Sequence, residues 1–153
     1  MPHPMGVTPP KDDSEYLERM SKAIFSAGLN WKMIDNKWPN FQAAFAGFSP
    51  GVVAKLPSTK VRELMEDTGI VRNEKKIIAT VENARAVLDI EKEYESVRKY
   101  LDSFGKHEER LQQDLQKRFQ QLGPSSARMF LWSVGYPLTP NKEEKAWMAA
   151  HRE

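Results

Sequence analysis

Residues 64–77 read LMEDTGIVRNEKKI and place a tight, glycine-containing turn between two helical patterns. Pro57-Ser58 can start the first helix, because a proline suits the beginning of a helix. Asn73 can cap a long second helix, whose apolar residues repeat on one face at i, i+4, i+7 and i+11: Ile77, Val81, Ala84 and Leu88. The stretch therefore predicts two helices joined by a short hairpin.

Helical periodicity extends in both directions from this hairpin. Upstream, Asp13 or Ser14 can cap a helix, and Pro39 with Asn40 is expected to open another short one. Downstream, the pattern continues over residues 97–104 and 111–122, and Asn141 can cap a last helix. No long run of alternating β-branched residues stands out. The sequence therefore predicts an all-α fold, a compact domain of eight to ten short helices.

The chain has 153 residues, with 23 Lys plus Arg against 21 Asp plus Glu, a formal net charge of +2 and no Cys. This length suits one helical domain over residues 13–153, after a flexible, Pro-rich segment over residues 1–12. The missing Cys excludes disulfides, thiol nucleophiles and Cys-ligated zinc, and the three His lie far apart, so we expect no metal and no cofactor. The sequence shows no secretory signal and no apolar run near the roughly 20 residues that cross a bilayer, which favours a cytoplasmic protein without membrane contact.

The hairpin itself is a candidate binding element. A tight turn before a helix can present unpaired backbone N–H groups and the positive end of the helix dipole, which together bind a phosphate without reading sequence. The candidate residues are Gly69, Ile70, Val71 and Arg72, with Lys75 and Lys76 beside them. An ordinary helical turn with a solvated Lys face explains the same pattern, so both interpretations stay open.

Two further segments have functional and structural interpretations. Gly28 and Leu29 form a turn with an apolar tip next to Trp31, which can enter a base stack and hold an extruded base. Leu and Trp at this spacing also suit a hydrophobic core. Ser125, in the run Gly123-Pro124-Ser125-Ser126, can bind an anion at a helix start or simply cap the helix.

These motifs follow one another in an order that resembles the DNA-3-methyladenine glycosylase I family. The matching runs are AGLNW at 27–31, NFQAAF at 40–45, DTGIVRN at 67–73, NARA at 83–86 and LGPSS at 122–126. The resemblance covers about residues 13 to 136. It implies a helix-hairpin-helix glycosylase that grips double-stranded DNA, flips out an alkylated adenine and hydrolyses its N-glycosidic bond. We also expect a monomer.

The resemblance also assigns roles to individual residues. Trp31 would line the base pocket, Gly28 and Leu29 would form the intercalating tip, and residues 69–72 would grip the DNA backbone. Alkylation at N3 makes the base cationic and already a good leaving group, so an aromatic pocket and a positioned water can supply much of the remaining catalysis.

The chain departs from the family at three places. Members usually bind a structural zinc through ligands that include Cys, and this chain has none. The usual acidic pocket residue, eight positions before the Trp, is Ala23, and an N-terminal aromatic position is taken by Met5. Neither Glu15 nor Glu18 is singled out as a replacement acid, so the catalytic residue is unassigned. Two alternatives follow: a non-catalytic DNA-binding module that kept the scaffold, or a helical protein with other partners.

Overall fold

The computed structural model describes residues 9–150 of the chain. The expectation for Met5, and that for most of segment 1–12, therefore lies outside the described residues. Within the described range the protein is all-α, as predicted, and its nine α-helices and one 3-10 helix agree with the expected eight to ten. The elements are α1 (Asp13–Ser26), α2 (Trp31–Ala44), η1 (Ala46–Phe48), α3 (Pro50–Val53), α4 (Ser58–Leu64), α5 (Glu74–Tyr94), α6 (Val97–Asp102), α7 (Glu108–Arg118), α8 (Pro124–Ser133) and α9 (Lys142–Ala150).

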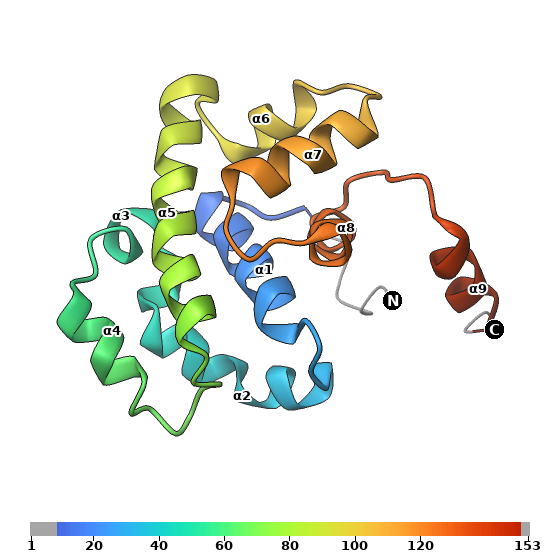
Figure 1. The fold of residues 1–153 in the computed structure, drawn as a ribbon. Coiled ribbons are helices and arrows are strands. Elements are labelled where there is room, and N and C mark those ends of the chain that lie inside the picture. The colour runs from blue at the N-terminus through green and yellow to red at the C-terminus, as the bar shows by residue number, and fades with distance from the viewer. Residues whose placement is uncertain (1–8, 151–153) are drawn as a thin grey trace.

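Helix α1 occupies the centre of the fold, between α5 and α8 (Figure 1). Its cap is Asp12, one residue before the predicted Asp13, because the Asp12 carboxylate accepts a hydrogen bond from the Glu15 N–H at 3.0 Å. Leu17, Met20 and Ile24 lie on one face of the helix, at intervals of three and four residues, and are buried. The helix therefore sets the position of the elements around it.

Helix α2 corrects the expectation that Pro39 opens a new helix. Residues Trp31–Ala44 form one helix with Pro39 inside it. Proline removes one backbone N–H donor, but Ile34, Trp38 and Phe41 are buried on either side of it and hold both halves against the core. Tertiary packing thus overrides the local preference of Pro39 for a helix start.

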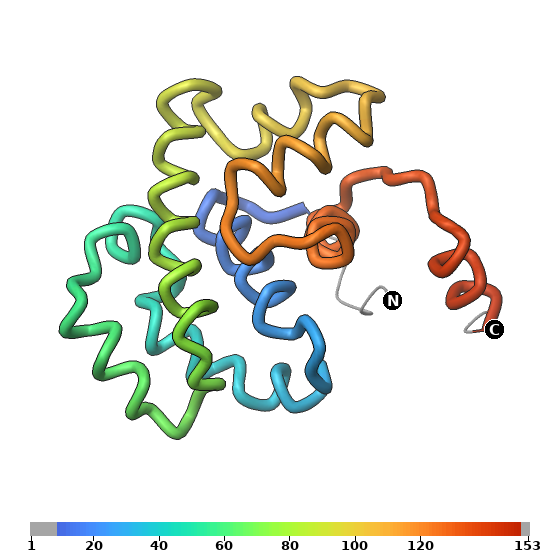
Figure 2. Tube along the Cα trace, viewed as in Figure 1, coloured from blue at the N-terminus to red at the C-terminus, as the bar shows by residue number. Residues whose placement is uncertain are grey.

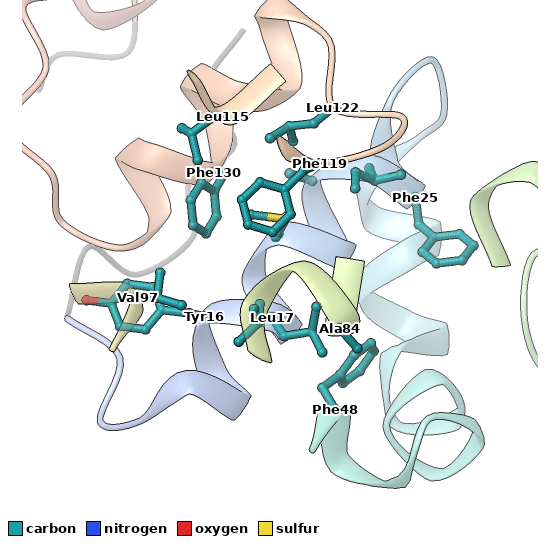
Figure 3. Packing of buried hydrophobic residues seen from close by; sticks show 14 of the residues in the cluster. Tyr16, Leu17, Phe25, Phe48, Ala84, Val97, Leu115, Phe119, Leu122 and Phe130 are labelled. Atoms are coloured by element: carbon teal, nitrogen blue, oxygen red, sulfur yellow. The ribbon is translucent and has the colours of Figure 1, made fainter. Parts of the chain in front are cut away.

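Aromatic side chains fill the space between α1 and α2. The ring of Phe25 meets that of Phe41 edge-on at 4.8 Å, and Trp38 stacks on Phe48 at 5.3 Å. On the other side of the core, Figure 3 shows side chains of residues 115–130 close together. These contacts belong to one cluster of buried hydrophobic residues that α1 to α8 share.

The long helix α5 begins directly after the predicted hairpin, and Asn73 caps it by accepting from the Lys76 N–H at 3.1 Å. Figure 2 shows α2 running along the same end of the molecule as the α4–α5 hairpin and the α1–α2 turn. Helix α9 lies at the edge of the molecule, after an extended link (Figure 1). None of the helices in the described range has the length and apolar character that a membrane crossing requires.

Candidate nucleic-acid interface

The α1–α2 turn, residues 27–30, carries an apolar surface. Leu29 and Trp31 are each 41% exposed and Met33 is 37% exposed, although large hydrophobic side chains elsewhere in the described chain are mostly buried. Gly28 follows Ala27, the C-terminal cap of α1, and has a φ of 74°, a left-handed conformation that a side chain would strain. Asn30 then caps α2 by accepting from the Lys32 N–H at 2.8 Å. Two caps therefore fix a tight turn whose hydrophobic side chains face solvent.

The hairpin between α4 and α5, residues 65–73, is held by its own side chains and leaves several amides unpaired. The Gly69 N–H donates to the Asp67 carboxylate at 2.8 Å, so this amide shapes the turn. Ile70 is buried and anchors the hairpin in the core. Within residues 9–150, the backbone N–H groups of Val71, Arg72, Glu74 and Lys75 have no hydrogen-bond acceptor. These donors lie at the start of a 21-residue helix, where the helix dipole favours an anion.

Helix α2 fixes the other side of the hairpin. Asn40 Nδ2 donates to the Gly69 carbonyl at 3.0 Å, and Lys37 Nζ donates to the Thr68 carbonyl at 3.4 Å. A side chain at Gly69 would be crowded, because its Cβ would lie 3.1 Å from the side chains of both Asn40 and Asp67. The sequence did not predict that Lys37 and Asn40 contact the hairpin. They lie 29 or more residues from their partners, and no local pattern links them.

Lys76 joins the hairpin to the α1–α2 turn. Its Nζ donates to the carbonyl of Ala27, the residue before Gly28, at 3.2 Å. Burial lowers the pKa of the Lys76 ammonium. The two segments that the sequence singled out separately are therefore adjacent in the fold.

The charged groups of the hairpin differ in their availability. Arg72 and Lys75 are exposed, and within the described residues neither forms an ion pair. Glu74 is also exposed and places one negative charge among them. Two free cations and four unpaired amides on one short segment suit a phosphate chain.

Ser125 has different surroundings. It lies in the first turn of α8, beside a cavity of about 230 Å³ that α8 shares with α9. Arg128 in this cavity is paired with Glu144, and Glu143 adds a further negative charge. Contact between Ser125 and the DNA backbone stays a prediction, in an environment less favourable than that of the hairpin.

The sequence over residues 6–135 matches the family described as methyladenine glycosylase. The chain belongs to the methyladenine glycosylase family. The match covers the α1–α2 turn, the hairpin and α8, so the expected resemblance is confirmed.

Curated relatives of this family member agree. DNA-3-methyladenine glycosylase 1 of Escherichia coli (strain K12) is 33% identical over 105 residues, which are 69% of this chain and 56% of that protein. DNA-3-methyladenine glycosylase of Haemophilus influenzae (strain ATCC 51907 / DSM 11121 / KW20 / Rd) is 30% identical over 99 residues, 65% of this chain and 54% of that one. The chain thus spans little more than half the length of these relatives.

Solved structures show the same fold. The 3-methyladenine DNA glycosylase I of Staphylococcus aureus superposes with a TM-score of 0.78 at 27% identity, covering 87% of this chain and 81% of that one. A variant of a 3-methyladenine DNA glycosylase I in complex with 3-methyladenine has a TM-score of 0.79 at 26% identity, covering 92% and 88%.

Position 23, where the resemblance leads us to expect an acidic residue, is a core position in this methyladenine glycosylase family member. Ala23 is completely buried on α1. Of the two nearby carboxylates, Glu15 pairs with Lys11 and Arg19, while Glu18 accepts hydrogen bonds from Trp38 Nε1 at 2.8 Å and Gln42 Nε2 at 2.7 Å. Both therefore have partners among the described residues, and the catalytic residue stays unassigned.

The residues present do not fit the family's zinc. The sequence has no Cys, and no cluster of three or more possible metal ligands occurs in the described part of the chain. The C-terminal helix is held by polar contacts instead. Arg128 Nε and Nη2 donate to the Glu144 carboxylate at 2.8 and 2.5 Å, and Nη2 also donates to the Thr139 carbonyl at 2.8 Å. Asn141 and Glu144 cap one another, with 2.8 Å from the Glu144 N–H to Asn141 Oδ1. We call Arg128, Thr139, Asn141 and Glu144 the C-terminal clasp.

Proposed function

We propose that this chain binds duplex DNA and releases a 3-methyladenine-type base by hydrolysing its N-glycosidic bond, as in base-excision repair. The observation that carries this proposal is the hydrogen bond from Lys76 to Ala27, which places an exposed apolar turn beside an amide-rich hairpin. The two relatives named as DNA-3-methyladenine glycosylases support the substrate class.

The hairpin acts as the grip on the DNA backbone. The unpaired amides of Val71 and Arg72 donate to phosphate oxygens, while the Arg72 and Lys75 side chains supply charge. Gly69 and Ile70 keep the hairpin in shape, through its close approach to Asn40 and through core burial respectively. None of these contacts reaches a base edge, so the grip is independent of sequence.

The α1–α2 turn acts as the wedge. Leu29 enters the space that the extruded nucleotide leaves, and Gly28 allows the backbone to approach the duplex closely. The indole of Trp31, 41% exposed at the start of α2, stacks on the extruded base. Such stacking contributes about 1–3 kcal/mol per base, and the positive charge of a 3-methylated adenine strengthens it.

The bond cleavage needs little further help from this substrate. Water attacks C1′ of the sugar, and the electron pair of the N-glycosidic bond moves onto the base. The base leaves as neutral 3-methyladenine because it entered with a positive charge, and the water proton passes to solvent. Ala23 can act neither as an acid nor as a base, so stacking on Trp31 and extrusion of the base carry the rate.

One observation favours the alternative, a DNA-binding module without catalysis. Ala23 packs in the core, so no carboxylate is available at this position to orient water or stabilise charge at C1′. The wedge and the grip would then serve to hold a damaged or abasic site.

Base release from methylated duplex DNA, measured beside binding to abasic-site duplex, separates the two functions. We expect 3-methyladenine release by the wild type and a roughly 10- to 100-fold loss in Trp31→Ala, in line with the stacking energy. Val52→Ala is the matched control, because Val52 is 49% exposed on α3 and lies outside the interface. Tight abasic binding with no release by the wild type would establish the module and reject the enzyme.

We further propose that residues 13–153 act as one domain and that the protein works as a monomer in the cytoplasm. The cluster of buried side chains that α1 to α8 share supports the single domain. Sedimentation in the presence and absence of DNA tests the monomer, with 17.6 kDa expected for the free protein.

A further inference from the structure

We propose that Lys76 is a positioning residue that holds the α1–α2 wedge against the hairpin, and that it is not a phosphate ligand. This inference rests on the proposed function in assigning the wedge to base extrusion. The contact itself can be tested in the free protein.

The Lys76 ammonium group already has a hydrogen-bond partner at the end of α1. Lys76 Nζ lies 3.2 Å from the carbonyl oxygen of Ala27, which is the C-terminal cap residue of α1. Carbonyls at the end of a helix lack intrahelical donors and carry the negative end of the helix dipole, so a Lys there is stabilising. The backbone of Lys76 is fixed as well, since its N–H donates to the Asn73 cap. The backbone N–H and the side-chain ammonium of Lys76 are therefore both hydrogen-bonded within the free protein.

Lys76 differs from the adjacent Lys75 in its burial. Lys75 is exposed and makes no contact of this kind among the described residues, whereas Lys76 is half-buried. Burial lowers the pKa of the Lys76 ammonium, and no carboxylate contributes to that shift. A phosphate ligand of a DNA grip needs an ammonium that faces solvent, and Lys75 meets this requirement better.

The contact between Lys76 and Ala27 joins the start of α5 to the end of α1. Asn40 and Lys37 of α2 hold the hairpin at Gly69 and Thr68, so α2 already fixes one side of it. The same helix begins at Trp31, immediately after the wedge. Lys76 adds a direct connection from the start of α5 to Ala27. The wedge, α2 and the hairpin thus form a closed ring of contacts.

The contact of Lys76 with Ala27 should fix the distance between the wedge and the gripped phosphates. Extruding a base costs a few kcal/mol, and this cost is met only if the wedge stands at the correct distance from the gripped phosphates. A misplacement of about 1 Å can reduce a rate by roughly 100-fold. Loss of the Lys76 contact should therefore slow base release on saturating DNA while the phosphate grip remains.

The test compares Lys76→Met with Lys75→Met. On abasic-site duplex, Lys75→Met should lower the slope of log affinity against log salt by about one, as expected for a lost phosphate contact, whereas Lys76→Met should leave the slope near the wild-type value. In single-turnover release of 3-methyladenine at saturating DNA, Lys76→Met should be slower by roughly 10- to 100-fold. Lys76→Arg should recover part of this rate, because a guanidinium can still donate to a carbonyl. Lys92→Met, an exposed Lys in the last turn of α5, is the neutral control.

A measurement without DNA keeps the inference independent of the proposed function. The Leu29 amide donates to the Ser26 carbonyl at 3.0 Å, so its hydrogen exchange reports the order of the wedge. Exchange should be faster in Lys76→Met and unchanged in Lys75→Met. If the wild type releases no base, the proposed enzyme fails, but faster Leu29 exchange still supports the positioning role. A Lys76→Met protein with wild-type Leu29 exchange and a salt slope lowered by about one would overturn the inference and make Lys76 a phosphate ligand.

Discussion

Replacing Arg128 by Met should release the C-terminal helix from the body of the protein. Arg128 is the only member of the C-terminal clasp that carries a positive charge, and its guanidinium contacts both oxygens of the Glu144 carboxylate. The variant keeps a long apolar side chain at this position but leaves Glu144 without a cation.

The expected magnitude follows from the burial of the pair. Glu144 is 5% exposed, and the side chain of Arg128 is 16% exposed. Removing one partner of a buried pair typically costs about 3–5 kcal/mol, because the remaining charge stays desolvated. Helix α9 can escape that cost by undocking, since Figure 1 shows it joined to the body by an extended link. We therefore expect the free energy of local opening of α9 to be about 3 kcal/mol lower in the variant than in the wild type. This difference corresponds to roughly 100-fold faster hydrogen exchange.

Hydrogen exchange of residues 142–150, measured by mass spectrometry at pH 7, is the direct assay. Arg110→Met is the matched control, because Arg110 on α7 is exposed and has no ion pair among the described residues. The double variant Arg128→Met/Glu144→Met should regain most of the protection, since an apolar pair replaces a buried ion pair at little cost. Wild-type protection in Arg128→Met would refute the clasp as the contact that holds α9.

The clasp should also weaken in acid. Burial acts to raise the pKa of Glu144, but the hydrogen bonds from Arg128 and from the Asn141 N–H outweigh burial and lower it below the ordinary value of 4.5. A lowered carboxyl pKa contributes stability above the unfolded-state pKa, and this stability is lost as the pH falls through the folded-state value. Protection of α9 in the wild type should therefore fall as the pH drops below about 4.5.

Three further variants test separate parts of the structure. Glu91→Gln should remove a pH dependence of opposite sign. A hydrogen bond with Asp13, and then burial, raises the pKa of Glu91 from 4.5 to about 7. The free energy of unfolding of the wild type, measured in urea, should therefore fall by roughly 1–2 kcal/mol between pH 4.5 and 7, after allowance for solvent screening. Gly69→Ala should cost about 1 kcal/mol in the same assay and more in DNA affinity, because its Cβ would lie 3.1 Å from Asn40 and displace the hairpin. Arg72→Ala should leave unfolding unchanged and lower the salt slope of DNA binding by about one, and an unchanged slope would exclude Arg72 from the grip.

Local patterns predicted the helices well where a helix buries a regular face. The stripe that begins at Ile77 lies in the core, and Asn73 and Asn141 cap helices as expected. Pro39 shows the limit of this approach. Trp38 packs on Phe48 of η1 at 5.3 Å and Phe41 packs on Phe25 of α1 at 4.8 Å, so contacts with other elements hold one continuous helix together across the proline.

The candidate interface was predictable as a set of segments and not as a site. The left-handed turn at Gly28 and the hairpin around Gly69 have glycine signals that are visible locally. The contacts that bring them together, Lys76 to Ala27 and Asn40 to Gly69, join residues 49 and 29 positions apart. Lys and Asn are common on helix surfaces, so nothing in their identity distinguishes a structural donor from a solvated one.

A chain with Ala at position 23 can keep the proposed grip, because the two features depend on different parts of the fold. The hairpin and the wedge are held by side-chain donors on α2 and α5 that contact backbone carbonyls, and none of these contacts involves Ala23. A substitution at position 23 can therefore remove an acid without disturbing DNA binding. A cationic leaving group needs the least assistance from such an acid, whereas a neutral base would need a proton that Ala23 cannot supply. The architecture consequently narrows the proposed activity toward positively charged lesions, in which extrusion and stacking on Trp31 provide most of the catalysis.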